Sequence, residues 1–225
     1  CSYSNTRNAI NDLSMNAAFS FTPSERTIFR FGAQYTHHQF SPAENANEST
    51  SSSIERKTNH KVIANEWNYY LEGDIQATRW LRFNAGLRGS FFRVEGKQYP
   101  VFEPRISTNL RLSSTVSLKA GYAKMSQFVQ QVSDNYISLP TDYWLPITKH
   151  FAPLISHQVS AGIYVSPSKR YTFSIEGYYK KMHNLLEYKD NYKYMQTDSW
   201  EQTLCSGNGR AYGMDFQAEA DFGNI

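Results

Sequence analysis

The chain has 225 residues and a net charge of only +3, and its Lys and Arg residues are scattered, which excludes a basic nucleic-acid-binding footprint. Its mean hydropathy is −0.59, and no run of about 18 apolar residues occurs, which excludes a membrane-spanning helix. A membrane β-barrel is not excluded, because its alternating strands average to a hydrophilic value. Aromatic residues form 15 % of the chain and 16 of them are Tyr, a high share for a soluble domain.

The two cysteines, Cys1 and Cys205, are too few for a disulfide framework and allow at most one bridge. A chain that begins with Cys matches either a mature lipoprotein acylated at Cys1 or a fragment cut from a longer chain. The start is irregular and has neither an initiator Met nor a signal peptide, which favours the fragment.

The first half of the chain predicts four long amphipathic strands. Residues 1–9 look like the tail of a loop. Apolar and polar residues then alternate along 10–21 and 29–36, around a turn at 23–26, and a Ser-, Asn- and Glu-rich loop follows at 39–63. Two further strands, 66–77 and 81–91, flank a tight turn at 78–80. The alternation of the last strand lasts about a dozen residues, whereas soluble strands usually stop at about five or six.

Charge placement predicts the register of the hairpin 66–91. If this hairpin is symmetric about Arg79, Glu72 lies diagonal to Arg88, and Asp74 lies diagonal to Arg82. Opposite charges then face each other on the polar side, within side-chain reach.

The second half predicts five more strands, connected in turn by short turns and long loops. A short loop at 95–101 precedes a strand in which Pro104 predicts a bulge or a locally unpaired stretch, because Pro cannot donate to the ladder. Long loops are expected at 127–154 and 183–208. The five strands are expected at 102–112, 116–123, 157–165, 171–180 and 214–222.

Strand length and loop asymmetry favour an all-β, antiparallel up-and-down transmembrane β-barrel over a soluble β-sandwich. A spanning strand needs about 9 to 11 residues, and outer-membrane barrels have short turns on one side and long loops on the other. Nine strands cannot make a complete single-chain bacterial barrel, because these barrels have even strand counts, so residues 1–225 predict part of a barrel domain. Aromatic residues at both strand ends match two interfacial girdles: Phe21, Phe29, Trp80 and Tyr171 near the turns, and Tyr35, Trp67, Phe91 and Tyr179 near the loops.

Three segments resemble TonB-dependent outer-membrane receptors. They are FEPRISTNLRLSSTVSLKAGYAKMSQF (102–128), IEGYYKKMHNLLEYKD (175–190) and GNGRAYGMDFQAEADFG (207–223), and the resemblance spans roughly 65–223. It implies a 22-stranded barrel plugged by a separate N-terminal domain and driven by the inner-membrane TonB complex through a TonB box. The sequence contains neither the plug nor the box. The loop LPTDYWLP resembles receptors of Bacteroidota, some of which pair with a surface lipoprotein.

The resemblance implies energised uptake of a nutrient, namely a siderophore, a vitamin or a glycan, across the outer membrane of a Gram-negative bacterium. These residues would supply barrel wall, in contact with outer-membrane lipids, and extracellular loops. One alternative is a soluble β-sandwich module that binds a ligand or carbohydrate. Another is a structural or adhesive outer-membrane barrel.

The sequence predicts no catalytic site, metal site or cofactor. His37 and His38 are adjacent, so they face opposite sides of a strand and cannot chelate one metal together. Exposed loop aromatics can stack on ligand rings, so Tyr136, Tyr143 and Trp144 are candidate ligand contacts, unless they simply pack the loop. The polar strand face predicts charges directed at a lumen, where they either hold a plug and pass a polar ligand or are merely solvated and paired: Glu72, Asp74, Arg82, Arg88, Arg105 and Arg111.

Overall fold

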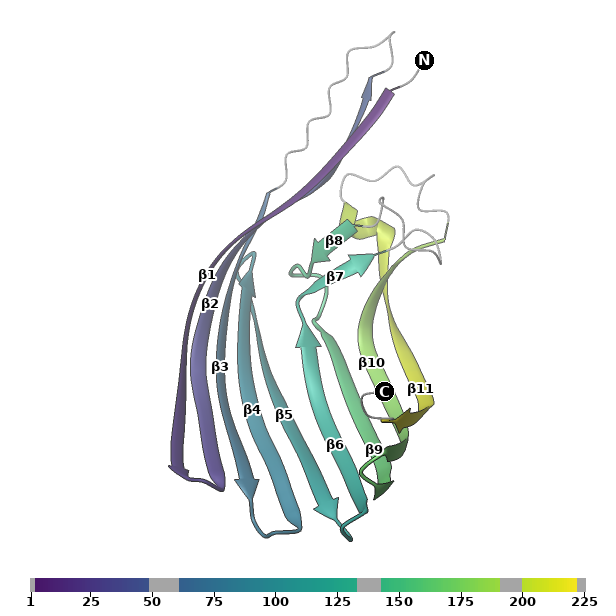
Figure 1. Ribbon diagram of the computed structural model, residues 1–225. Coiled ribbons are helices and arrows are strands. Elements are labelled where there is room, and N and C mark those ends of the chain that lie inside the picture. The colour runs from purple at the N-terminus through teal and green to yellow at the C-terminus, as the bar shows by residue number, and fades with distance from the viewer. Residues whose placement is uncertain (1–2, 49–60, 133–142, 191–199, 222–225) are drawn as a thin grey trace.

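The computed structural model describes residues 3–48, 61–132, 143–190 and 200–221, which form one long curved antiparallel sheet with a small hairpin folded against it (Figure 1). The small hairpin consists of β7 (Val129–Val132) and β8 (Tyr143–Pro146), and one 3₁₀ helix covers Trp200–Thr203. The strands of the main sheet are β1 (Tyr3–Ser24), β2 (Thr27–Glu48), β3 (Val62–Gln76), β4 (Leu81–Val94), β5 (Lys97–Arg111), β6 (Val116–Gln127), β9 (Leu154–Ser168), β10 (Tyr171–Tyr188) and β11 (Leu204–Ala220).

The nine strands of the main sheet pair in chain order, which confirms the predicted up-and-down antiparallel topology for the described residues. Short turns connect the strands at one end, which is the lower end in Figure 1, and the longer connections lie at the other end, together with the short β4–β5 turn. We call these the turn end and the loop end. No helix in the described residues is long and apolar enough to cross a membrane.

Several strands extend further toward the loop end than the sequence predicted. The first strand pairs with the second as far as Tyr3 and Glu48, so residues 3–9 are strand rather than loop tail. The predicted loop at 95–101 is wrong, because Val94 already pairs with Lys97. Glu95 and Gly96 alone make this turn, with φ angles of 48° and 82°, as two-residue hairpin turns require. Polar residues such as Lys97 and Gln98 do not end the strand, because the hydrogen bonds of the ladder join backbone groups whatever the side chains.

Pro104 of β5 is paired with β4 on one side and unpaired on the side of β6, and it does not form a bulge. It stands opposite Leu87 of β4 in uninterrupted register, so the predicted bulge is wrong. On its other side the pairing of β5 with β6 begins only at Arg105, so the predicted unpaired stretch is confirmed there. Because Pro has no N–H, this break in the ladder costs it no hydrogen bond.

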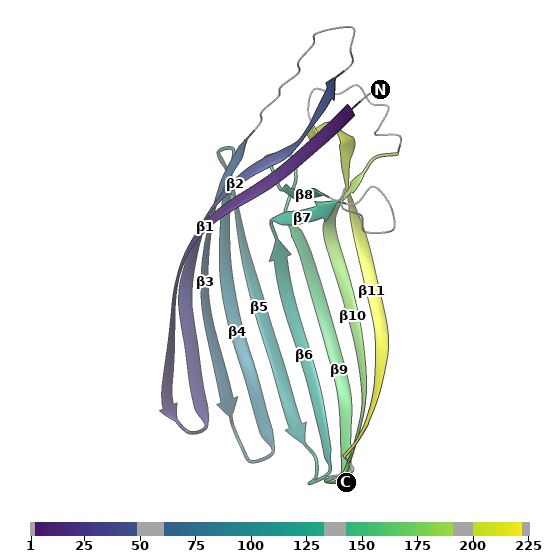
Figure 2. The same cartoon turned by 45° about the horizontal axis from the view of Figure 1, so that its top comes forward.

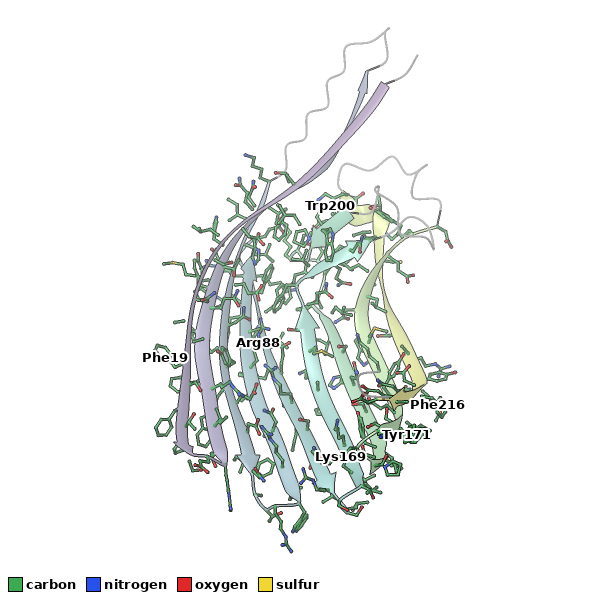
Figure 3. All side chains as sticks on the ribbon, in the orientation of Figure 1. Phe19, Arg88, Lys169, Tyr171, Trp200 and Phe216 are labelled. Atoms are coloured by element: carbon green, nitrogen blue, oxygen red, sulfur yellow. The ribbon has the colours of Figure 1, made fainter. Side chains whose placement is uncertain are left out.

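The sheet has an apolar convex face and a polar concave face, as the alternation predicted. The side chains of Phe19 and Phe216 project away from the sheet on its convex side (Figure 3). The convex side chains are unusually exposed, with 75 % of Phe216 and 70 % of Met15 accessible. A continuous apolar face of this extent is the mark of an interaction or membrane surface.

Aromatic residues form two short rows on the convex face. Tyr35, Trp67 and Phe91 stand opposite one another on β2, β3 and β4. Tyr179 and Tyr212 stand opposite each other on β10 and β11. The register therefore assembles side chains that are far apart in the sequence into two short aromatic rows.

Candidate functional site

The concave face brings the six predicted lumen charges onto one surface. Residues opposite each other in an antiparallel pair share a face, and Gly86 of β4 stands between Glu72 of β3 and Arg105 of β5. The even-numbered residues of β3 and β4 and the odd-numbered residues of β5 therefore face the same side. This set contains Glu72, Asp74, Arg82, Arg88, Arg105 and Arg111.

Near the turn end this surface carries ordered ion pairs. Arg82 donates two hydrogen bonds to the Asp74 carboxylate, at 2.7 and 2.6 Å, and the hairpin register is centred on Arg79 as predicted. Glu72 instead bonds Arg30 at 3.2 Å and the Asn84 amide at 2.9 Å. The expected contact of Glu72 with Arg88 is therefore not made, because β2 supplies a nearer cation.

An open polar hollow of about 390 Å³ lies beside these ion pairs. Lys119 places its ammonium 3.6 Å from the centre of the Tyr164 ring, and the Tyr164 hydroxyl donates to Glu176. Both charged and neutral hydrogen-bonding groups line it, so it suits polar contents: Asp74, Arg82, Asn84, Ser107, Asn109, Lys119, Ser160, Tyr164 and Glu176.

A second line of polar groups crosses the concave face nearer the loop end. His38 Nδ1 lies 2.8 Å from an Asp12 oxygen, and His38 Nε2 lies 3.4 Å from a Glu66 oxygen. Arg88 continues the line, 3.7 Å from Glu66 and 3.5 Å from Glu103. The line thus joins β1 to β5, and its carboxylates are shared among neighbouring strands.

Glu103 extends this line to β6 in place of the missing ladder bonds. Its carboxylate accepts hydrogen bonds from the Ser126 amide and hydroxyl, and from the Ser90 hydroxyl at 2.9 Å. Only 7 % of Glu103 is exposed. A buried carboxylate with this many donors is a structural anchor, since its charge is satisfied by groups that all come from neighbouring strands.

Beyond the polar line the concave face becomes apolar, which the sequence analysis did not anticipate. The side chains of Phe92 and Phe128 stack at 4.7 Å between ring centres, with planes 4° apart. The cluster combines sheet residues with residues of the 127–154 connection: Phe40, Val62, Ala64, Phe92, Val94, Tyr99, Val101, Phe128 and Ile147. The available signal was that Phe92 and Val94 are apolar although the alternation of this strand assigns them to its polar face.

The β7–β8 hairpin lies inside the curve of the sheet near its loop end (Figure 2), and Val129 of β7 packs against this cluster. Tyr99 donates a 2.6 Å bond to the Thr148 carbonyl on one side. On the other side, the Gln130 side chain donates to the Asn184 carbonyl and accepts from the Leu186 amide, both at 3.1 Å. A second apolar cluster of Val132, Leu145, Leu186 and Leu204 joins the hairpin to β10 and β11.

The predicted ligand aromatics lie in or beside this hairpin. Trp144 is on β8 and is 45 % exposed. Tyr143 begins the same strand, where only the backbone is described, and Tyr136 lies outside the described residues. The structure therefore places one of the three side chains, and it is accessible.

The described histidines contact other protein groups, and the rings of His157 and His183 also lie edge to face at 6.4 Å. His37 contacts Asn65 at 2.9 Å and His38 contacts Asp12, so the two adjacent rings do face opposite sides. His150 pairs with Glu201, while Cys205 is exposed on β11 and Cys1 lies outside the described residues. Within the described residues, no three His, Cys, Asp or Glu side chains gather to hold a metal ion.

A curved wall that is apolar outside and polar inside, with only short turns at one end and all its long connections at the other, is the architecture of an outer-membrane β-barrel. The family model described as "TonB dependent receptor-like, beta-barrel" matches residues 2–225. The chain belongs to this family, which confirms the resemblance noted in its sequence. Barrels of this family are outer-membrane proteins of Gram-negative bacteria, and that is the location of this chain.

Solved receptors share the fold at low sequence identity. The FrpB iron transporter from Neisseria meningitidis, in its F5-1 variant apoprotein form, is 14 % identical with a TM-score of 0.65, over 98 % of this chain and 35 % of that one. The siderophore receptor PirA from Acinetobacter baumannii is 13 % identical with a TM-score of 0.63, over 97 % and 35 %. PirA from Pseudomonas aeruginosa is 12 % identical with a TM-score of 0.64, over 95 % and 40 %.

The chain spans about a third of the length of these solved receptors. A search of curated proteins found no match. At such identities the likeness establishes the fold.

Proposed function

We propose that the chain forms wall and outer mouth of a receptor that takes up a nutrient across the outer membrane, and that its concave face is the lumen. The observation that carries this proposal is the division of the sheet into an exposed apolar convex face and a polar concave face. A soluble β-sandwich would bury its apolar face, whereas this one is accessible along its length. The six charges Glu72, Asp74, Arg82, Arg88, Arg105 and Arg111 would then line the lumen.

The orientation follows from the connections. Outer-membrane barrels carry long loops on the extracellular side, so the loop end would face outward. The β7–β8 hairpin, tied to both halves of the sheet, would then narrow the outer opening from within. A ligand would pass this hairpin first, then the polar line of His38, Glu66 and Arg88, and finally the hollow beside Asp74.

The ligand class remains the one the sequence suggested, a siderophore, a vitamin or a glycan. Two of the structural relatives are siderophore receptors and another is an iron transporter, which favours a siderophore. Trp144 supplies an exposed ring on the hairpin, and Tyr136 and Tyr143 are proposed to act with it. Energy would come from the TonB complex through an N-terminal plug region, and a surface lipoprotein would serve as a further partner.

The proposal is tested on the full-length receptor in its own outer membrane. A receptor-deletion strain is complemented with wild type, and accumulation of labelled ferric siderophores, cobalamin and oligosaccharides is measured with and without an intact TonB complex. We expect one of these classes to accumulate only with both receptor and TonB. Accumulation that is independent of TonB, or none in any class, would refute energised nutrient uptake.

Trp144→Ala tests the ligand contact in the same assay. Truncating an exposed aromatic that stacks on a ligand costs about 1 kcal/mol or more, so ligand affinity should fall about fivefold or more. Trp80→Ala is the matched control, because Trp80 is similarly exposed at 49 % but lies at the turn end. Equal effects of the two substitutions would contradict a ligand contact at Trp144.

A further inference from the structure

The β7–β8 hairpin contacts two distant parts of the wall. β8 contacts β2, and β7 contacts β10. Along the sheet, β2 and β10 are six strand spacings apart, which is about 29 Å at about 4.8 Å per spacing. Figure 1 shows the hairpin inside the curve of the sheet, near the loop end. The hairpin therefore crosses the concave side of the wall, and each of its two strands is held by a different part of the sheet.

The attachment to β10 is built around a β-bulge at Asn184. The pairing of β10 with β11 shifts register between His183 and Leu185. Asn184 has a φ angle of 62°, in the left-handed region that Asn tolerates better than most residues. A bulge takes its residue out of the ladder, so the polar groups of that residue are free to bond elsewhere. The groups of Asn184 bond to the connection between β6 and β9.

Gln130 of β7 occupies the place that the bulge leaves open. Its Nε2 donates to the Asn184 carbonyl, and its Oε1 accepts from the Leu186 amide, both at 3.1 Å. The side-chain amide thus pairs with β10 as a peptide group of a neighbouring strand would. Only 4 % of Gln130 is exposed, so water cannot replace either bond without moving the hairpin. The contact is specific to an amide at this position.

Asn184 also holds the other end of the same connection. Its side-chain Nδ2 donates to the carbonyl of Pro153, just before β9, at 2.9 Å. Gln130 lies near the start of the connection and Pro153 near its end. One residue of β10 therefore fastens both ends of the segment that carries the hairpin. We call Gln130, Pro153 and Asn184 the bulge clamp.

Apolar contacts on both sides keep the hairpin in place. Phe128 and Ile147 belong to the first apolar cluster, on the strands β2 to β5. Val132 and Leu145 belong to the second cluster, beside β10 and β11. All four side chains are buried, so a swing of the hairpin away from the wall would expose apolar surface on both sides to water. This packing is that of a fixed element rather than of a loose loop.

We propose that the bulge clamp holds the β7–β8 hairpin as a fixed bar across the outer opening, and that this bar limits the size of the molecules that enter the lumen. Gln130 and Asn184 are then positioning residues that determine specificity without touching the ligand. Their effect is exerted on the polar line of His38, Glu66 and Arg88, which lies on the turn-end side of the bar. The proposal rests on the orientation given under the proposed function.

The first test measures how firmly the hairpin is held, by amide hydrogen exchange on the purified full-length receptor. Asn184→Gly keeps the positive φ angle but removes the side-chain bond. Gln130→Glu keeps the shape of the side chain but places an oxygen against the Asn184 carbonyl. Loss of one buried hydrogen bond shifts an opening equilibrium about tenfold, so exchange at residues 129–132 and 143–145 should become about tenfold faster in each variant. Gln131→Glu is the matched control, because Gln131 is the exposed neighbour, and it should exchange like wild type.

The second test measures the size limit itself, in cells that carry the full-length receptor with Cys1→Ser and Cys205→Ser. Gln34→Cys places a thiol on the concave face of β2, on the turn-end side of His38. Labelling rates are measured with a small maleimide and with maleimide-linked polyethylene glycols of increasing mass. The small maleimide should react equally in all variants. Polymers that the wild-type clamp excludes should label both clamp variants about tenfold faster, whereas Gln131→Glu should keep the wild-type limit.

An identical size limit in wild type and both clamp variants would overturn the proposal, and so would an equal change in Gln131→Glu. Wild-type exchange at residues 129–132 that is already as fast as in the variants would also overturn it, because the hairpin would then not be fixed. Both clamp variants should keep the urea midpoint of wild type, which separates a changed opening from a misfolded barrel. The size limit is measured without any nutrient, so it is decided independently of whether the receptor accumulates one.

Discussion

If the apolar convex face contacts lipid, a charged side chain introduced at its centre should destabilise the protein. Leu71 and Leu87 stand opposite each other on β3 and β4 and are both about half exposed, at 58 % and 49 %. Leu71 is four residues from Trp67 in one of the aromatic rows, about 13 Å along the strand. At the usual strand tilt of about 35–45° this is about 10 Å along the membrane normal, near the middle of an apolar band about 25 Å tall.

An arginine at that depth costs about 2–4 kcal/mol. We therefore expect Leu71→Arg and Leu87→Arg each to lower the free energy of unfolding of the full-length receptor by that amount, measured by urea titration in phospholipid vesicles. Ser107→Arg is the matched control, because Ser107 is exposed on the concave face and should change stability by about 0.5 kcal/mol or less. If both leucine variants matched the control, the convex face would not contact lipid.

Three other substitutions test the loop end. Phe92→Ala removes a side chain that is 1 % exposed and stacks on Phe128, so it should lower the local free energy of unfolding by about 3–5 kcal/mol. Amide hydrogen exchange at residues 129–132 should become faster. Phe102→Ala, on the convex face, should leave that exchange unchanged. Glu103→Gln replaces a carboxylate oxygen that accepts hydrogen bonds with an amide group that donates them. It should lower the free energy of unfolding, measured by urea titration, by about 1–3 kcal/mol. An unchanged value would refute the role of Glu103 as an anchor. Gly96→Val should cost about 1–2 kcal/mol from backbone strain alone, because φ is 82° and nothing lies near the added Cβ. Gly207→Val, equally unobstructed and at ordinary φ, should leave the melting temperature unchanged.

Features that depend on neighbours along the chain could be predicted from the sequence. The side-chain period of two assigns each strand residue to a face, so the apolar face of 81–91 and the polar face with Arg82 and Arg88 were both recognised. The Asp74–Arg82 pair was also predictable, because one tight turn determines the register of both strands. Strand ends were less accurate, since backbone pairing continues through polar residues such as Lys97 and Gln98.

The sequence by itself determined that this chain is a long-stranded antiparallel wall with one apolar and one polar face, and to which family it belongs. Only the tertiary structure decided that the β6–β9 connection packs against Phe92, and that Gln130 bonds to the bulge at Asn184. The physical reason is the range of the interactions. Alternation is a property of each strand alone, whereas loop packing and the contact at the bulge require the register of several strands at once.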